Sequence, residues 1–413
     1  MLSDTICRVP ASPIGAMFDR ATELRLRGSN LVDLSLGEPD FDTPEHIRTA
    51  AIEAINAGFT RYTAADGSVA LKDAVRRKFA RDNGLAFERS QVVIASGAKP
   101  LIASAMQVVL DRGDKIIIPT PAWTSHVGMA QVCAATPVLL KTSESQGYRI
   151  DANQLESIIT AETKLLLLCS PGNPTGAVTS AEELGAIAEV LRRHPHVNVI
   201  SDDLYEHVVF PPAIFATLAQ VAPDLAERVL TVNGLSKAYA MTGWRIGYAG
   251  GPSWWTAGLR VLFSQTSGGP CSISQAAGVA ALDGPQEFLA EWREVYRRRC
   301  ALAVAELSKI QGLKPRMPQG AFFLYVECGA YIGKRTPNGH VIASSTDLAE
   351  HLLAAGVVTV PGAAFYGDPF IRLSVATSDA NIVEGTRRIA AGCSQLGPSD
   401  IEAPISVGRE LVP

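Results

Sequence analysis

The sequence has few features of secreted, disulfide-bonded or membrane proteins. Its seven cysteines are scattered over 413 residues without a CxxC pair, so no disulfide framework is predicted and a reducing, cytoplasmic compartment is expected. The most concentrated apolar run, residues 165–169, is far too short to cross a bilayer and suits a buried strand. The first residues do not combine a basic segment with an apolar run, so no secretory signal is expected.

Charge and motifs argue against several other functions. Lys and Arg total 37, Asp and Glu total 41, and the net charge is -4. The cations are spread along the chain without a basic stripe, so neither a nucleic acid nor a membrane is expected as a partner. The HExxH motif and any histidine array are absent, so no metal is expected. No repeat with a period of about 20–50 residues is evident.

The sequence does contain enough apolar residues for a large core. Hydrophobic residues make up 47% of the chain, which suggests two domains of unequal size. From residue 91 short apolar runs alternate with helical segments, which predicts an α/β fold with a mainly parallel seven-stranded sheet covered on both faces. Two connections are too short for a helix and allow an antiparallel neighbour. The strands are expected at residues 91–95, 115–118, 137–140, 165–169, 197–201, 229–232 and 245–249.

The same pattern divides the chain into four parts. We expect an N-terminal arm and part of a small domain at residues 1–45, a large domain at 46–288, a small α+β domain at 289–396, and a loose tail at 397–413. The small domain is expected to begin with a long helix rich in Arg and Glu. Its three consecutive arginines are predicted to form a solvated face: Arg297, Arg298 and Arg299.

One lysine stands in an otherwise uncharged run. Lys237 lies among small and aromatic residues in segment 233–247, and Arg245 follows eight residues later. Desolvation lowers the pKa of a lysine, and a neutral amine is the nucleophile that forms a Schiff base with an aldehyde. A single lysine is more often an ordinary solvated side chain, so the surrounding residues decide between the two interpretations.

The surrounding residues favour the nucleophile. The run SKAY at residues 236–239 and the run GWRIG at 243–247 resemble the lysine motif of class I, fold type I aminotransferases, which use pyridoxal phosphate. GEPDFDTP at 37–44 and SDDLYEH at 201–207 support this, and the similarity extends over roughly residues 31–392. It is closest to bacterial aspartate and aspartate/prephenate aminotransferases. The resemblance implies a homodimer with shared active sites that acts on an amino acid and a 2-oxo acid.

The resemblance also implies roles for side chains around the cofactor. Lys237, Asp202 and Tyr205 are the expected catalytic residues: the amine binds the aldehyde, the carboxylate pairs with the pyridine nitrogen, and the phenol hydrogen-bonds the cofactor oxygen. Gly97 follows a predicted strand and opens a helix, where free N–H groups bind phosphate. Trp123 is expected to stack on the ring. The expected cofactor contacts are Gly97, Ala98, Lys99, Trp123, Asn173, Asp202, Tyr205, Ser236, Lys237, Arg245 and, from the neighbouring subunit, Tyr62.

Several of these residues lie just past the ends of predicted strands. Open α/β sheets bind ligands beyond the carboxyl ends of their strands, so the fold rule and the family motifs predict the same edge. Arg372 lies between two apolar residues in a predicted strand. A structural ion pair is the ordinary explanation, because buried charges are normally paired. The resemblance instead implies a bidentate clamp for the substrate α-carboxylate. The expected substrate contacts are Gly37, Lys99, Trp123, Asn173 and Arg372.

The identity of the amino donor rests on three positions. Lys99 matches a lysine that the aspartate subgroup directs at the distal carboxylate, which favours aspartate or glutamate with 2-oxoglutarate. Ile14 offers no hydroxyl where relatives commonly carry one, and Ala122 stands where most relatives have tyrosine. These two departures leave room for a larger or more apolar donor, such as an aromatic, aliphatic or prephenate-type substrate.

Two other classes of function remain open. The same cofactor site can serve elimination or substitution, whereas Arg372 argues against decarboxylation. A non-enzymatic sensor that borrows the fold normally carries an added nucleic-acid-binding domain, for which the short, non-basic N-terminus leaves no space.

Overall fold

The large sheet has the seven strands that the apolar runs predict. The computed structural model describes residues 2–7, 9–11 and 13–398, so the predicted tail lies outside the described residues except for positions 397 and 398. The strands form one sheet in the order β2-β8-β7-β6-β5-β3-β4. Their bounds are Val92–Ala95 (β2), Lys115–Thr120 (β3), Thr136–Lys141 (β4), Thr163–Cys169 (β5), Asn198–Asp202 (β6), Val229–Gly234 (β7) and Gly247–Gly250 (β8).

One strand of this sheet, β8, pairs antiparallel with both of its neighbours. It lies between β2 and β7, whereas the pairs among β7, β6, β5, β3 and β4 are all parallel. The short connection from β7 to β8 accounts for this, since it contains no crossover helix. The predicted start of this strand at residue 245 is wrong. Arg245 has a φ of 57°, a left-handed conformation that cannot continue a strand.

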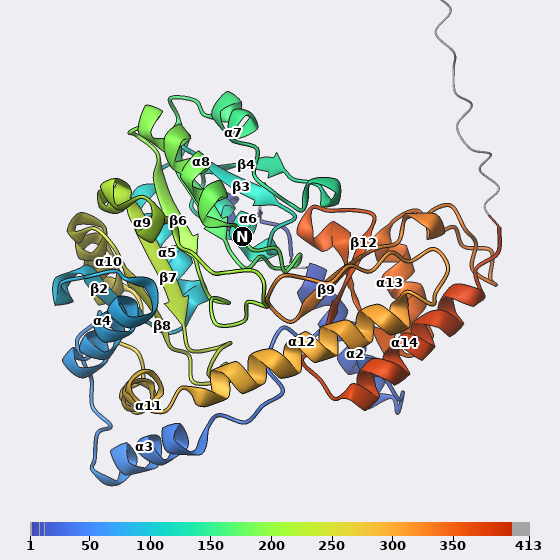
Figure 1. Ribbon diagram of the computed structural model, residues 1–413, viewed down its shortest axis with the longest axis horizontal. Coiled ribbons are helices and arrows are strands. Elements are labelled where there is room, and N and C mark those ends of the chain that lie inside the picture. Colours follow the sequence, from blue (N-terminus) through green and yellow to red (C-terminus); the bar gives the residue numbers. More distant parts are fainter. Residues whose placement is uncertain (1, 8, 12, 399–413) are drawn as a thin grey trace, which may run out of the picture.

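Helices cover both faces of the sheet (Figure 1). Side chains of β2 and β5 alternate between two cores, because successive residues of a strand point to opposite faces. Leu166 and Leu168 belong to the core that contains α4, α8 and α11, while Leu165 and Leu167 belong to the core with α5, α6 and α10. The bounds of these helices are Val69–Asn83 (α4), Ala98–Val109 (α5), Thr124–Val132 (α6), Ala181–Arg193 (α8), Ser253–Gln265 (α10) and Ser272–Asp283 (α11).

A third core forms around a three-stranded antiparallel sheet in the order β11-β12-β9. The short strand β1 pairs in parallel with β10, which brings residues near the N-terminus against the C-terminal third of the chain. The helix α12, Glu287–Leu307, connects the two sheets (Figure 1). The bounds are Pro13–Leu26 (α2), Val32–Asp33 (β1), Glu45–Asn56 (α3), Phe323–Glu327 (β9), Ser345–Ala354 (α13), Val357–Val358 (β10), Val360–Pro361 (β11), Phe370–Ser374 (β12) and Asp379–Ser394 (α14).

The prediction of a solvated arginine face on α12 is wrong for one of its three residues. Arg297 and Arg298 form ion pairs on the exposed surface. Arg299 is 9% exposed, donates to Asp40 at 2.8 Å and lies 5.7 Å from the centre of the Phe41 ring. One residue along a helix turns the side chain by about 100°, so a run of three arginines spans both the solvent and the core side. Over the described residues, no helix is long and apolar enough to cross a membrane.

We predict that Gly247→Ala destabilises the protein. A Cβ at this position would lie 2.3 Å from the backbone nitrogen of Ala98, and such a clash costs about 1–3 kcal/mol. Gly185→Ala is the matched control, since nothing lies within 4 Å of its added Cβ, and alanine stabilises a helix interior by roughly 0.5–1 kcal/mol. Urea unfolding should give a lower midpoint for the first variant and a slightly higher one for the second. An unchanged midpoint for Gly247→Ala would contradict the close packing of β8 on α5.

Candidate active site

A cavity of about 580 Å³ lies at the carboxyl ends of the parallel strands. This is the edge at which the fold rule places ligands. The structure brings to this cavity all the predicted site residues except Gly97, which lies directly beside it in sequence, and Tyr62. The predicted residues that line it are Gly37, Ala98, Lys99, Trp123, Asn173, Asp202, Tyr205, Ser236, Lys237, Arg245 and Arg372.

The Lys237 side chain lies in the turn after β7 and is half-buried. Its Nζ donates a hydrogen bond to the backbone carbonyl of Gly37. The pKa of Lys237 is lowered to about 8, mainly by burial and also by the nearby Arg372 and Arg245, while the carboxylates of Glu38 and Asp202 oppose this shift. A substantial fraction of the amine is therefore neutral near physiological pH, as nucleophilic attack on an aldehyde requires.

The Asp202 carboxylate ends β6 and lies in the floor of the cavity. It is 4% exposed, and its Oδ2 lies 3.1 Å from His126 Nε2. Its Oδ1 is buried and has no hydrogen-bond partner among the described residues. A buried carboxylate oxygen without a partner is costly, and a protonated ring nitrogen in the cavity is a donor of the kind that it lacks. The unpaired oxygen of Asp202 is therefore suited to accept a hydrogen bond from a pyridinium ring.

His126 is a site residue that the sequence reasoning missed. It lies in the first turn of α6, three residues after Trp123, and is 1% exposed. The signal was present, because α6 begins just past the end of β3, at the same edge of the sheet as Asp202. A single histidine in a helix gave no reason to pair it with an aspartate 76 residues away.

The sequence places Asp203 next to Asp202, and with Asp202 assigned to the cofactor Asp203 is expected to be the surface carboxylate of the pair. This expectation is wrong. Asp203 is 1% exposed and accepts a hydrogen bond from Ser201 Oγ at 2.7 Å. Burial raises the pKa of Asp203 to about 7. Successive residues at the end of a strand point to opposite sides, so Asp202 faces the cavity while Asp203 faces the protein interior.

A corner of the cavity is suited to a phosphate. Gly97 caps α5 with a φ of 104°, and a Cβ there would lie 2.4 Å from Arg245 Nη2. Arg245 donates to the backbone oxygen of Thr242 at 3.1 Å and has no ion-pair partner among the described residues. The free N–H groups of the first turn of α5 add to this positive corner. Glycine and a free guanidinium together leave room and charge for a phosphate, and Ser236 lines the same cavity.

Arg372 is a buried cation on β12 without a carboxylate partner in the described part of the chain. It is 3% exposed, donates to Asn173 Oδ1 at 3.0 Å and to the carbonyl of Ser35 at 2.6 Å, and its Nε is unpaired. The guanidinium lies 4.4 Å from the ring centre of Phe323 and 5.0 Å from that of Phe365. Burial lowers the pKa of Arg372 to about 10. Since buried charges are normally paired, the site lacks an anion.

The remaining predicted residues lie at the sides of the cavity or outside it. Tyr205 is buried, and its ring meets those of Phe322 and Phe323 edge-on. Lys99 is exposed, and its ammonium lies 5.2 Å from the centre of the Trp123 ring. Tyr62 is fully exposed and does not reach the cavity of its own chain.

The two departures from the family pattern lie in different places. Ile14 lines the main cavity together with Phe18. Ala122 does not line it. It is 6% exposed and lies at a smaller cavity of about 60 Å³ behind Trp123. Ile14 therefore alters the wall that a substrate meets, whereas Ala122 alters the support of Trp123.

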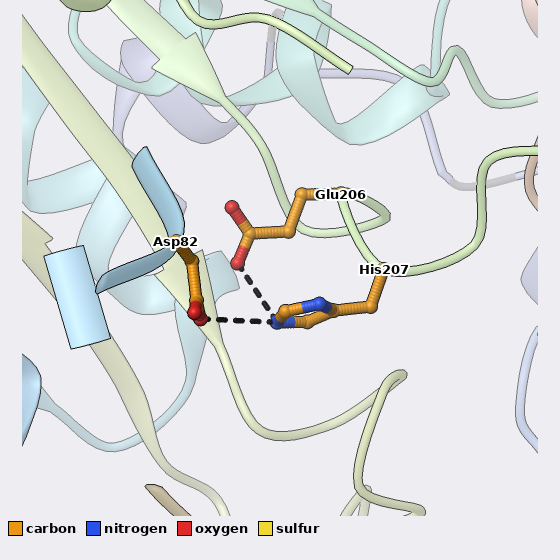
Figure 2. A group of neighbouring side chains, drawn as sticks. All are labelled: Asp82, Glu206 and His207. Atoms are coloured by element: carbon orange, nitrogen blue, oxygen red, sulfur yellow. Dashed lines mark ion pairs between the residues drawn. The ribbon is translucent and has the colours of Figure 1, made fainter. Parts of the chain in front are cut away.

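Three side chains near the site have atoms that metals bind: Asp82, Glu206 and His207 (Figure 2). His207 Nε2 lies 3.1 Å from Glu206 and 3.8 Å from Asp82. Both carboxylates already have cationic partners, because Glu206 pairs with the buried Lys78 and Asp82 pairs with Arg81 at 2.7 Å. We interpret this cluster as an ion-pair network that joins α4 to the segment after β6, since a divalent cation would add charge to a balanced group.

We predict that Lys237 in the cofactor-free protein titrates near pH 8, compared with about 10.4 for an ordinary lysine. The measurement is the pH dependence of amine labelling, read for the Lys237 peptide by mass spectrometry. Between these two values the unfolded chain holds more protons than the folded one, so Lys237 makes stability rise with pH across this window. A labelling midpoint near 10 would contradict the burial of the amine.

Comparison with known proteins identifies the family of this chain. Residues 29–389 match the family described as "Aminotransferase class I and II". An aspartate aminotransferase of Rhizobium meliloti (strain 1021) is 49% identical over 392 residues, 95% of this chain and 96% of the relative. The aspartate/prephenate aminotransferase of Cereibacter sphaeroides is 45% identical, over 96% of this chain and 99% of the relative.

Solved structures give the same result. The aspartate aminotransferase from Rhizobium meliloti has a TM-score of 0.93 at 48% identity and covers 96% of this chain and 100% of its own. Thermus thermophilus aspartate aminotransferase with maleate has a TM-score of 0.89 at 36% identity, with 95% and 99% covered. The chain therefore belongs to the class I and II aminotransferases, enzymes that use pyridoxal 5'-phosphate.

Proposed function

We propose that this enzyme transfers the amino group of aspartate to a 2-oxo acid such as 2-oxoglutarate, or of glutamate in the reverse direction. The observation that carries the proposal is the buried, unpaired guanidinium of Arg372 in the same cavity as the Lys237 amine. Arg372 offers a planar fork to an α-carboxylate. The relatives named as aspartate aminotransferases, one of them with the dicarboxylate maleate, support an acidic substrate.

Residues from several elements would hold the cofactor in this proposal. The first turn of α5, Ser236 and Arg245 would bind its phosphate, and Trp123 would lie against its ring. Asp202 would accept a hydrogen bond from the ring nitrogen, while His126 contacts that carboxylate through Nε2. When bound, pyridoxal phosphate supplies an electron-accepting ring that stabilises negative charge on the substrate α-carbon. Asn173 and Tyr205 would donate hydrogen bonds to its phenolic oxygen.

Lys237 performs the proton transfer in this proposal. Its amine would hold the aldehyde of pyridoxal phosphate until an amino acid occupies the site. The same amine, which donates a hydrogen bond to the carbonyl of Gly37, would then take the proton from the substrate α-carbon and release it again. An amine with a pKa of about 8 is suited to both steps near neutral pH.

The part of the cavity expected to hold the distal end of the substrate is lined by both charged and apolar side chains. Lys99 has no ion-pair partner among the described residues and supplies a positive charge for a second carboxylate. Ile14, Phe18 and Ile102 line the same cavity and favour an apolar body. A larger donor of the prephenate type is therefore the second candidate, and one relative carries that substrate in its name.

We further propose that the enzyme is a cytoplasmic homodimer. Arg245 is exposed although it belongs to the site, and Tyr62 is fully exposed. Apolar side chains near Tyr62 and on α10 are also exposed, which marks a surface for a second copy: Ile52, Ile55, Phe59 and Val261. In such a dimer Tyr62 would contact the cofactor phosphate of the neighbouring subunit. Sedimentation of a monomer at micromolar concentration would contradict this arrangement.

We predict that Lys237→Ala abolishes turnover and the absorbance band of the lysine–cofactor Schiff base, because no other amine replaces Nζ. Retained cofactor affinity is expected, since the phosphate and ring contacts stay. Spectra with added pyridoxal phosphate and a coupled assay measure both properties. Lys141→Ala, at an exposed position, is the control and should match the wild type. Turnover by the Lys237 variant would refute the assigned role.

We predict that Arg372→Lys lowers kcat/KM for aspartate by about 100-fold, roughly 2.7 kcal/mol, because lysine keeps the charge but loses the bidentate fork. The same loss is expected for every amino acid in a donor panel, since all carry an α-carboxylate. Lys99→Met is the matched variant and should weaken only aspartate and glutamate. A wild-type preference for an aromatic or aliphatic donor over aspartate would favour the second candidate.

A further inference from the structure

Only two carboxylates line the cavity in the described part of the chain, and one of them has no role so far. Asp202 lies in the floor. Glu38 directly follows Gly37 and is exposed at the side of the cavity. Four cationic side chains line the same cavity: Lys99, Lys237, Arg245 and Arg372. Glu38 is therefore an acidic group in a surrounding that is otherwise positive.

The position of Glu38 is fixed by a contact with the lysine-bearing segment. Thr242 Oγ1 donates to Glu38 Oε2 at 3.1 Å, five residues after Lys237. Gly37, next to Glu38, accepts the hydrogen bond from Lys237. Thr43 adds a further link, since its hydroxyl donates to the carbonyl of Ala240 at 2.6 Å. Residues 37–43 are thus attached along the segment that carries the catalytic amine.

The charge of Glu38 acts on the amine as well. Burial, Arg372 and Arg245 all disfavour the protonated form of Lys237, whereas Glu38 and Asp202 favour it. His126, Tyr205 and Lys99 line the same cavity. In the proposed function Asp202 is engaged by the ring nitrogen. Glu38 is then the carboxylate that remains to stabilise a proton on the released amine.

We propose that Glu38 is a positioning residue for Lys237, whose carboxylate stabilises the protonated amine and whose hydrogen bond with Thr242 fixes the turn that carries this lysine. The inference rests on the proposed function, because it concerns the amine that moves the proton. A base that takes a proton from carbon must hold it until the cofactor accepts it. A nearby carboxylate increases the basicity of the amine and so favours the transfer of the proton from carbon to the amine.

The test separates the charge of Glu38 from its hydrogen bond. Glu38→Gln removes the charge but keeps an oxygen that accepts from Thr242. Thr242→Val removes the donor and leaves the charge, which is then free to turn toward solvent. Glu182→Gln, an exposed glutamate on α8 outside the cavity, is the control for loss of an acidic group.

The measurement is the labelling midpoint of Lys237 in the full-length protein, both free of cofactor and loaded with the aminated form of the cofactor, in which the lysine is free. We expect Glu38→Gln to lower the midpoint by about half a pH unit, or about threefold more neutral amine at pH 7. The shift is modest because Glu38 is exposed and screened. Thr242→Val should lower it by less, and the control should not move it.

Equal midpoints in the wild type and in Glu38→Gln would overturn the proposal. An unchanged midpoint in Thr242→Val would overturn the part assigned to the hydrogen bond. Both substitutions replace side chains outside the core, and thermal unfolding checks that each variant folds. The cofactor-free protein reports on Glu38 even if no cofactor binds, so failure of the proposed function, seen as absent cofactor uptake, is distinguishable from failure of this inference.

Discussion

The active site depends on the burial of a cation that the protein does not pair with a carboxylate. Arg372 lies close to two aromatic rings, its only hydrogen bonds go to neutral oxygens, and its Nε has no partner among the described residues. Withdrawing charge from water costs free energy unless a partner of opposite sign is present. No carboxylate among the described residues pairs with Arg372, so a carboxylate that enters the cavity meets a cation that is already desolvated and oriented.

The fold forms this site by bringing backbone segments into close contact where the strands end. Small residues permit this approach, as at Gly97, where any side chain would meet Arg245, and at Gly247, where it would meet the first turn of α5. The parallel strands then present Asp202 and Lys237 from neighbouring positions in the sheet, since β6 pairs directly with β7. The precision of the site comes from strands rather than from mobile loops.

Much of the fold followed from the sequence because buried strands are continuous apolar runs. The run at residues 165–169 forms most of the interior strand β5, and all seven strands were predicted to within a few residues. The errors share a cause: burial depends on what packs against a residue. Asp203 and Arg299 are charged residues in polar surroundings of the sequence, yet both face the interior. His126 was missed because its partner, Asp202, is remote in the chain. Arg245 was placed in a strand because the residue types around it do not indicate a left-handed backbone conformation.

The two groups that would anchor the substrate in the proposed function belong to different parts of the molecule. Arg372 extends from the small antiparallel sheet, while Lys237 follows a strand of the large one. An amino acid held at its carboxylate by the first and at its nitrogen through the second spans the boundary between two hydrophobic cores. In the proposed function the bound substrate would therefore link the two parts of the protein, and its release would separate them again.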